Sequence, residues 1–197
     1  MASEPARRID PDFPNLSQDV VDGYRSPPSG MIAEVINGVL YTMTRPRPVH
    51  QRAGGELHAE LRGPFDRGRN GPGGWVLLPE PELELGDRPD LVEPDVAGWR
   101  RERLPSRPPG AITVAPDWVC EILSNSTRRH DLIVKMPMYY RHEVAHAWLV
   151  DPDACTLQVY RRVTDGWLLV QSAAGEEVVR AEPFEAVELD LALLWRW

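Results

Sequence analysis

Three residues of this sequence, Asp95, Glu121 and Lys135, have types and spacing that could carry out chemistry. Lys135 is the only lysine among 22 basic residues, and all the others are arginine. Arginine can serve for surface charge and most ion pairs, but its planar guanidinium cannot replace a compact ammonium that must contact a single reacting oxygen. An arginine-favouring genome that spared one exposed lysine would give the same count. Together with its neighbours, the lone lysine indicates a point-charge role.

Asp95 and Glu121 are carboxylates in two segments that we expect to be strands. If these strands are neighbours in one sheet, the two side chains can lie side by side and hold a divalent metal ion, with open positions for water and substrate. A helix after Glu121 could then bring Lys135 to the same place. Taken singly, Asp95 could be a turn or capping aspartate, and Glu121 could form a buried ion pair with an arginine.

The pattern of apolar and turn residues predicts the elements that must position these groups. Asn37-Gly38 between two apolar segments is a strong hairpin signal. Leucines four residues apart predict a helix over 50–61, and a second helix should cover much of 128–143, with Pro137 forcing a late start or a kink. Strands are expected at 32–37, 38–43, 75–78, 82–85, 91–99, 118–123, 145–150, 156–161 and 167–171.

Length and composition indicate one folded domain. The chain has 197 residues, 42% of them hydrophobic, and its 20 prolines favour short elements over long helices. Residues 1–30 are rich in Pro, Asp and Ser and should form a loosely ordered leader, followed by a single domain over 31–197. Cys120 and Cys155 offer no disulfide framework and no zinc-binding spacing, so we expect reduced thiols.

Targeting and charge limit where the protein acts and what it binds. No run of about 18 apolar residues could span a membrane, and the amino terminus lacks the apolar core of a signal peptide, so a cytoplasmic protein is expected. The net charge of -8 argues against a protein that binds nucleic acid over most of its surface, because such binding depends on Lys and Arg that neutralise phosphates. No GxSxG, P-loop or GxGxxG motif is present, which disfavours the common hydrolase, nucleoside-triphosphate and dinucleotide sites.

The central part of the chain carries an ordered set of motifs. They are Val92–Pro105, Pro116–Ser124, Asp131–Lys135 and Trp148–Pro152, with Thr127 and Tyr139 between them and with Glu34–Gly38, His50, Gly74–Trp75 and Pro81–Leu83 before them. In order and spacing, this set resembles the Uma-two restriction-endonuclease family, a branch of the PD-(D/E)XK nuclease superfamily. The resemblance covers roughly residues 33–152.

The resemblance implies roles for the three residues named first. Asp95 matches the metal-binding aspartate of the superfamily, and Glu121 matches the acidic residue of its (D/E)XK element. The lysine of that element should stand at position 123, which is Leu123 here. The resemblance implies that Lys135 supplies the ammonium from the following helix. Because strand side chains alternate, Glu121 and Leu123 share one face, and a lysine from above could occupy the vacated place.

The resemblance also implies a metal site and its surroundings. Mg²⁺, with Mn²⁺ as a substitute, would be held by Asp95, Glu121 and the carbonyl of Ile122, and Glu82 is a further candidate ligand unless it is a solvated strand residue. Candidates for supporting roles are Glu34, His50 and Asp131, of which Asp131 could instead cap a helix. Candidate phosphate contacts are Arg100, Arg101, Arg128 and Arg129, with a solvated charged rim as the alternative for each.

We therefore expect an α/β (α+β) domain with a restriction-endonuclease-like central mixed β-sheet flanked by helices and an N-terminal β-hairpin extension. The expected activity is Mg²⁺-dependent endonucleolytic hydrolysis of phosphodiester bonds in DNA, and a homodimer would allow both strands to be cut. Two alternatives stay open. The chain could be a non-catalytic module that uses the nuclease fold for binding, or a metal-dependent hydrolase of another phosphoester.

Overall fold

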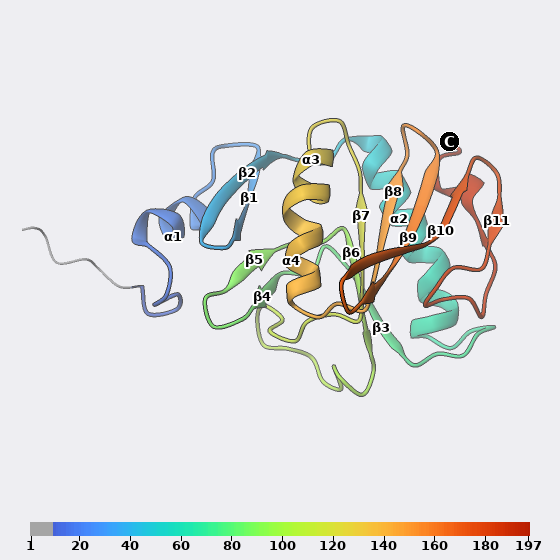
Figure 1. Ribbon diagram of the computed structural model, residues 1–197, viewed down its shortest axis with the longest axis horizontal. Coiled ribbons are helices and arrows are strands. Elements are labelled where there is room, and N and C mark those ends of the chain that lie inside the picture. The colour runs from blue at the N-terminus through green and yellow to red at the C-terminus, as the bar shows by residue number, and fades with distance from the viewer. Residues whose placement is uncertain (1–9) are drawn as a thin grey trace, which may run out of the picture.

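A six-stranded mixed β-sheet forms the centre of the molecule (Figure 1). The computed structural model describes residues 10–197, so residues 1–9 of the expected leader lie outside the described residues. The strand order is β10-β9-β8-β7-β6-β3, with β7 and β8 parallel and the other neighbours antiparallel. The strands are β3 (Trp75–Pro79), β6 (Val96–Arg100), β7 (Trp118–Ile122), β8 (His146–Asp151), β9 (Thr156–Val163) and β10 (Gly166–Ala174). The predicted central mixed sheet is confirmed.

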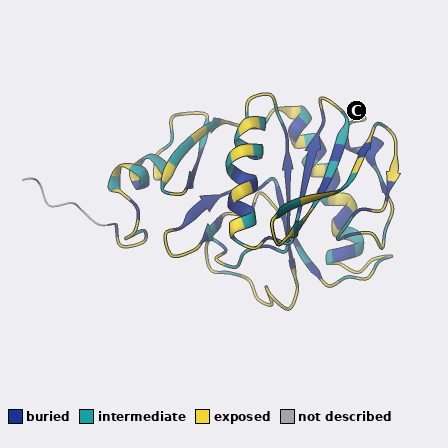
Figure 2. Ribbon diagram, in the orientation of Figure 1, coloured by how far each residue is buried: buried dark blue, intermediate teal, exposed yellow. Residues whose placement is uncertain are grey.

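Helices cover both faces of this sheet (Figure 1). One face packs against α2 (Pro48–Leu61), which continues into the π-helical turn η1 (Arg62–Asp66). The other packs against a continuous helical segment made of α3 (Arg128–His130), the π-helical turn η2 (Asp131–Lys135) and α4 (Met136–Arg141). Figure 2 shows the central strands buried and the outer side of this segment exposed.

The alternation of side chains along β7 assigns its residues to these two faces. Trp118, Cys120 and Ile122 belong to the apolar cluster that includes α2, whereas Val119 and Leu123 belong to the cluster that includes α4. Since the period is two, Glu121 points to the same side as Leu123, toward the helical segment that carries Lys135. This is the shared face predicted from the sequence.

The central sheet is packed too tightly at one position to accept any side chain. A Cβ atom added to Gly98 in β6 would lie 2.7 Å from Leu77, 3.2 Å from Trp118 and 3.3 Å from Trp75. Atoms at such separations must move apart, and overpacking of this kind costs about 1–3 kcal/mol. The absence of a side chain at Gly98 therefore leaves room for the rings of Trp75 and Trp118 beside the strand that follows Asp95.

A second, four-stranded sheet has the order β2-β1-β5-β4. Its strands are β1 (Met31–Ile36), β2 (Val39–Thr44), β4 (Leu83–Leu85) and β5 (Asp90–Val92). Strands β1 and β2 form the predicted hairpin, and both turn residues have positive φ, 55° at Asn37 and 74° at Gly38. That combination is the type I′ turn for which an Asn-Gly pair is suited. The N-terminal hairpin is confirmed.

One expected strand is divided between the two sheets. The sequence predicts a continuous strand over 91–99, but β5 ends at Val92 in the small sheet and β6 begins at Val96 in the large one. Pro94 lies in the break. Proline has no N–H to donate, so within a continuous strand it would leave one hydrogen bond of the ladder unmade. The break places Asp95 at the junction of the two sheets.

The described part of the leader packs onto the small sheet. Helix α1 (Gln18–Arg25) falls where the sequence allows a short helix, and its Val21 is fully buried in a cluster with Val35 and Leu91. Asp10 accepts hydrogen bonds from Arg25 and from the backbone N–H of Asp12. Residues 10–30 thus contribute an apolar cluster of their own.

The C-terminal residues complete the α2 face of the central sheet. The strands β11 (Val178–Val179) and β12 (Leu189–Asp190) pair with each other, and the 3-10 helix η3 (Leu191–Leu194) follows. Their buried residues join the cluster formed by α2, in which Phe184 packs against several tryptophans. Across residues 10–197 there is no helix with the length and apolar character required to cross a membrane.

Candidate active site

A cavity of about 90 Å³ lies where the small sheet, the start of α2 and the end of β7 meet. It brings together Asp95, Glu121 and Lys135, the three residues predicted to carry the chemistry. The three residues predicted to support them also line it, namely Glu34 from β1, His50 from α2 and Asp131 from η2. Six residues spread over 102 positions of the sequence therefore share one space.

Asp95 is held from two sides. Its Oδ2 atom accepts a hydrogen bond of 2.6 Å from the backbone N–H of Ile122, and its Oδ1 atom lies 3.3 Å from Nε2 of His50. Burial alone would lower the pKa of His50, but the hydrogen bond to Asp95 and the charge of that carboxylate raise it. The contact with His50 fixes the orientation of the Asp95 carboxylate and favours an imidazolium beside it.

Lys135 bridges carboxylates from the two sheets. Its Nζ atom lies 2.8 Å from Oε1 of Glu121 in β7 and 3.1 Å from Oε1 of Glu34 in β1. The side chain is 5% exposed and comes from a π-helical turn, a local widening of the helix that occurs frequently at functional sites. The hydroxyl of Tyr139 in α4 also donates a hydrogen bond to Oε1 of Glu121.

The Glu34 carboxylate has its own set of donors. It accepts a hydrogen bond of 3.1 Å from the backbone N–H of Glu93 and contacts Nε2 of His130 at 2.9 Å. Burial alone would raise the pKa of Glu34, but Lys135, His130 and the Glu93 amide together lower it. Glu34 is therefore an anion that keeps the ammonium of Lys135 in place.

The positive charge near Glu121 does not fully compensate for the burial of its carboxylate. Burial raises its pKa well above the ordinary value; Lys135 opposes this rise, and the nearby Asp95 adds to it. The pKa of Lys135 is itself raised well above its ordinary value, because Glu121 and Glu34 outweigh the opposite effect of burial. A single ammonium thus serves two buried carboxylates, and Glu121 takes up a proton more readily than an ordinary glutamate.

The donor set fits a hard divalent cation such as Mg²⁺. Five carboxylates line the cavity, Glu34, Glu93, Asp95, Glu121 and Asp131, with Lys135 as the lysine among them. Within residues 10–197 no group of three or more His, Cys, Asp and Glu side chains is arranged to hold a metal ion by itself. Mg²⁺ does not require one, because it is commonly bound by one or two carboxylates together with water and substrate phosphate oxygens.

Two further predicted ligands have different positions. The backbone of Ile122 reaches Asp95 through its N–H group, and the role of its carbonyl as a ligand stays a prediction. Glu82 is exposed and does not line the cavity; it lies beside Tyr24 and Arg45 in a neighbouring hollow. The structure thus brings Ile122, but not Glu82, to the carboxylate pair.

The four arginines proposed as phosphate contacts lie outside this cavity. Arg100 stacks over the ring of Trp75, and Arg101 pairs with Asp66, both at the far end of β6. Arg128 pairs with Asp151. Arg129 is exposed beside a second cavity next to the first.

Sequence reasoning missed two cations at the mouth of the site. Arg45 and Arg47, between β2 and α2, line the cavity and are exposed. Neither has a salt bridge within the described part of the chain, residues 10–197. The usable signal was the Arg45-Pro46-Arg47 pattern just before a helix that starts with Pro48, because helix N-termini favour anions.

Comparisons with known proteins agree with this architecture. The family model Uma2, described as "Putative restriction endonuclease", matches residues 21–193. A solved structure described as "a putative nuclease belonging to DUF820 from Anabaena variabilis" is similar with a TM-score of 0.69 and 21% identity, over 89% of this chain and 96% of that one. No curated protein matches. Since the family model spans most of its length, the chain belongs to the Uma2 family.

Proposed function

We propose that this protein is a Mg²⁺-dependent endonuclease that hydrolyses phosphodiester bonds in DNA. The observation that carries the proposal is the convergence of Asp95, Glu121 and Lys135 in one cavity, with the ammonium of Lys135 2.8 Å from Glu121. Membership of the Uma2 family and the similarity to a protein described as a putative nuclease support the same class of reaction.

Asp95 and Glu121 are the side chains that would hold the metal ion, with the Ile122 carbonyl as a third donor. Bound Mg²⁺ would supply a water of lowered pKa and neutralise charge on the phosphate. A divalent cation would relieve the repulsion between these two carboxylates and favour the ionised form of Glu121. Mn²⁺, which also prefers oxygen ligands, should substitute for it.

The residues around the carboxylates orient the reacting groups. Hydrolysis forms a bond from the water oxygen to phosphorus and breaks one ester P–O bond, and the leaving oxygen takes up a proton. Lys135, clamped between Glu34 and Glu121, would stabilise the negative charge that develops on the phosphate, an effect that a site largely closed to water strengthens. His50 would keep the Asp95 carboxylate in position.

The mouth of the cavity suits a phosphate backbone. Arg45 and Arg47 are exposed there, and α2 begins directly after them at Pro48; the N-terminus of a helix favours anions. The two arginines put positive charge at the edge of the cavity in a protein whose net charge is -8. Each arginine that contacts a phosphate should steepen the dependence of binding on salt.

Plasmid nicking tests the proposal. Supercoiled plasmid is incubated with Mg²⁺, with Mn²⁺ or with EDTA, using the native protein and the variants Asp95→Ala, Glu121→Ala and Lys135→Met. Glu82→Ala is the matched control, because it removes a nearby carboxylate that does not line the cavity. We expect metal-dependent nicking that all three site variants lose and Glu82→Ala retains.

Other outcomes would redirect the proposal. Salt-sensitive DNA binding without cleavage over a range of metals would indicate a non-catalytic binding module. Cleavage of small phosphodiesters alone would indicate a hydrolase of another phosphoester, and cleavage of RNA in preference to DNA would change the substrate. Nicking that survives Glu121→Ala would show that the activity does not come from this cavity.

A further inference from the structure

A second cavity, of about 410 Å³, adjoins the candidate active site on the side of the hairpin. It is lined by Tyr41, Ser126, Arg129, His130, Ile133 and Val134. Ser126 lines both cavities, so the two share a rim. The volume falls within the range of about 300–1,000 Å³ that is typical of sites for small organic groups.

One wall of this second cavity is aromatic. The ring centroids of Tyr41 in β2 and His130 in α3 lie 4.7 Å apart with an interplanar angle of 52°. Tyr41 is partly buried and lines the cavity, whereas the His130 side chain is only 11% exposed and packs against the Tyr41 ring. Aromatic faces that are anchored and accessible in this way stack against other flat rings.

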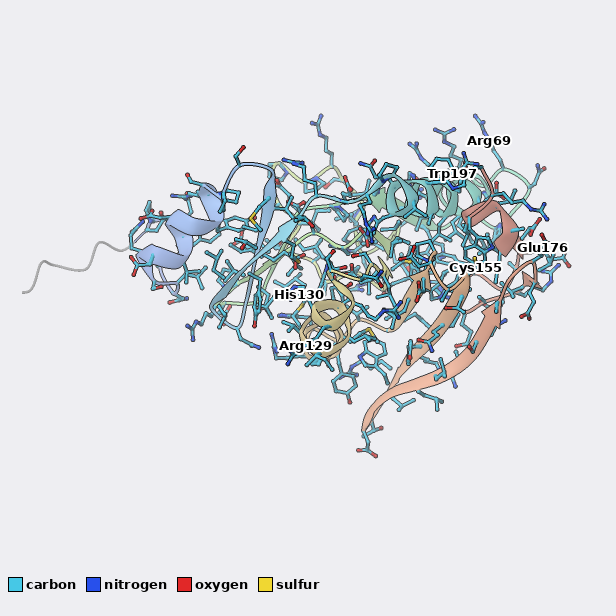
Figure 3. The ribbon with its side chains drawn as sticks, turned by 90° about the horizontal axis from the view of Figure 1, so that it is seen from above. Arg69, Arg129, His130, Cys155, Glu176 and Trp197 are labelled. Carbon is cyan, nitrogen blue, oxygen red and sulfur yellow. The ribbon has the colours of Figure 1, made fainter. Side chains whose placement is uncertain are left out.

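The remaining lining combines an apolar side chain with a cation. Ile133 is 65% exposed and presents an apolar side chain to the cavity. Arg129 is exposed and forms no salt bridge with any residue in the range 10–197. Figure 3 shows Arg129 next to His130 at the α3 end of the helical segment. A flat ring attached to an anionic group would stack on the aromatic wall, contact Ile133 and pair with Arg129.

His130 also connects the second cavity to the first. Its ring contacts Tyr41, while its Nε2 atom contacts Glu34 at 2.9 Å, and Glu34 holds Lys135 at 3.1 Å. Tyr41 and Glu34 are direct partners in the β1–β2 register. A group seated against Tyr41 and His130 would therefore be separated only by Glu34 from the lysine that contacts Glu121.

We propose that the second cavity binds an unpaired nucleobase of the nucleic-acid substrate, next to the phosphate that occupies the candidate active site. This inference rests on the proposed nuclease function and narrows its substrate to DNA that can present a base outside the helical stack, such as a mismatch, a bulge or a single strand. Tyr41, held by its contact with His130, supplies the stacking surface, Ile133 an apolar contact and Arg129 a contact to the flanking phosphate.

Metal-free binding tests the subsite without any cleavage. Fluorescence anisotropy in EDTA measures the affinity of the native protein for a duplex with one unpaired base, for the same duplex with an abasic site at that position, and for the fully paired duplex. We expect the unpaired base to bind most tightly. Tyr41→Ala should weaken that complex roughly 5- to 150-fold, the usual effect of losing one base-stacking partner, and leave the abasic complex unchanged.

Two further variants separate stacking from folding. Tyr41→Phe keeps the ring and should bind as the native protein does, and Leu168→Ala removes an exposed apolar side chain from β10, away from both cavities. A 2-aminopurine at the unpaired position should have its fluorescence altered by the native protein and by Leu168→Ala, but not by Tyr41→Ala. Equal affinity for the abasic and the base-containing duplex would overturn the inference, as would an equal effect of Tyr41→Ala on all three duplexes.

The subsite and the nuclease proposal can fail independently. Metal-dependent nicking through Asp95 and Glu121 with no preference for an unpaired base would refute the subsite alone. Base-dependent binding without any cleavage would retain the subsite and refute the nuclease. Affinity for none of the three duplexes would overturn the nucleobase assignment.

Discussion

Replacing Lys135 with methionine should lower the free energy of unfolding by about 3–5 kcal/mol at pH 8. The ammonium lies 2.8 Å from Glu121 and 3.1 Å from Glu34, and all three side chains are almost fully buried. Methionine fills much of the same volume, so the loss would come mainly from two carboxylates left without their counter-charge. For a chain of this length, the loss corresponds to a fall in Tm of about 2–4 °C per kcal/mol.

The loss of stability caused by Lys135→Met should be larger at pH 8 than at pH 5. In the native protein the pKa of Lys135 is raised well above its ordinary value of 10.5, so its stabilising charge is fully present below that pH. In the variant, Glu121 would be buried without a cation and Glu34 would keep only its contact with His130, so the pKa values of both should be higher than in the native protein, and that of Glu121 should lie above the 4.5 of the unfolded chain. The variant should therefore lose stability as pH rises above 4.5 and recover part of it near pH 5.

Urea unfolding followed by tryptophan fluorescence at pH 5, 6.5 and 8 measures this difference, and the seven tryptophans provide the signal. Arg69→Met is the control, because Arg69 is exposed and lies well away from His130 in Figure 3. Its effect should stay within about 0.5 kcal/mol. If Lys135→Met unfolds within 0.5 kcal/mol of the native protein at pH 8, with an unchanged slope against urea, then Lys135 does not neutralise the buried carboxylates and the electrostatic reasoning is wrong.

Asp131→Asn should stabilise the protein by about 2–3 kcal/mol at pH 8 but by only about 0.5 kcal/mol at pH 4, because burial raises the pKa of Asp131 from 3.8 to about 6 and only the ionised form carries the penalty. Thermal unfolding at both pH values checks this. The double variant Lys135→Leu with Leu123→Lys should regain part of the nicking activity that Lys135→Leu loses, whereas no regain would show that only the helical position delivers the ammonium. Arg45→Ala should reduce the slope of log affinity against log salt by about one, and Arg101→Ala should leave the slope unchanged.

Local sequence signals were sufficient for much of the fold. The Asn37-Gly38 pair predicted a hairpin because few residue pairs tolerate two successive positive φ values, and the structure has the hairpin there. The adjacency of Asp95 and Glu121 followed from expecting their strands to be neighbours in one sheet, and β6 pairs with β7 in register Val96 to Cys120. Alternation then placed Glu121 on the side of the helix that carries Lys135.

The cations around the site could not be predicted from proximity in sequence. Arg100 is five residues from Asp95, but a strand advances about 3.3 Å per residue, so β6 carries it about 17 Å from the carboxylates. Arg45 and Arg47 are about 50 residues from Asp95 and still line the cavity, because the hairpin returns the chain to the start of α2. That placement depends on how the two sheets pack, for which the sequence carries no local signal.

The small sheet helps to form the candidate active site and is not only an extension of the nuclease fold. Its strand β1 supplies Glu34, and the break between its strand β5 and the central β6 positions Asp95, so both ends of the cavity depend on where the two sheets meet. Lys135 joins them directly, with one carboxylate partner in each sheet. An ammonium held between two separate sheets can be displaced by a shift of either one. Contacts on the hairpin, including those at Tyr41, are therefore in a position to adjust the lysine that the proposed reaction requires.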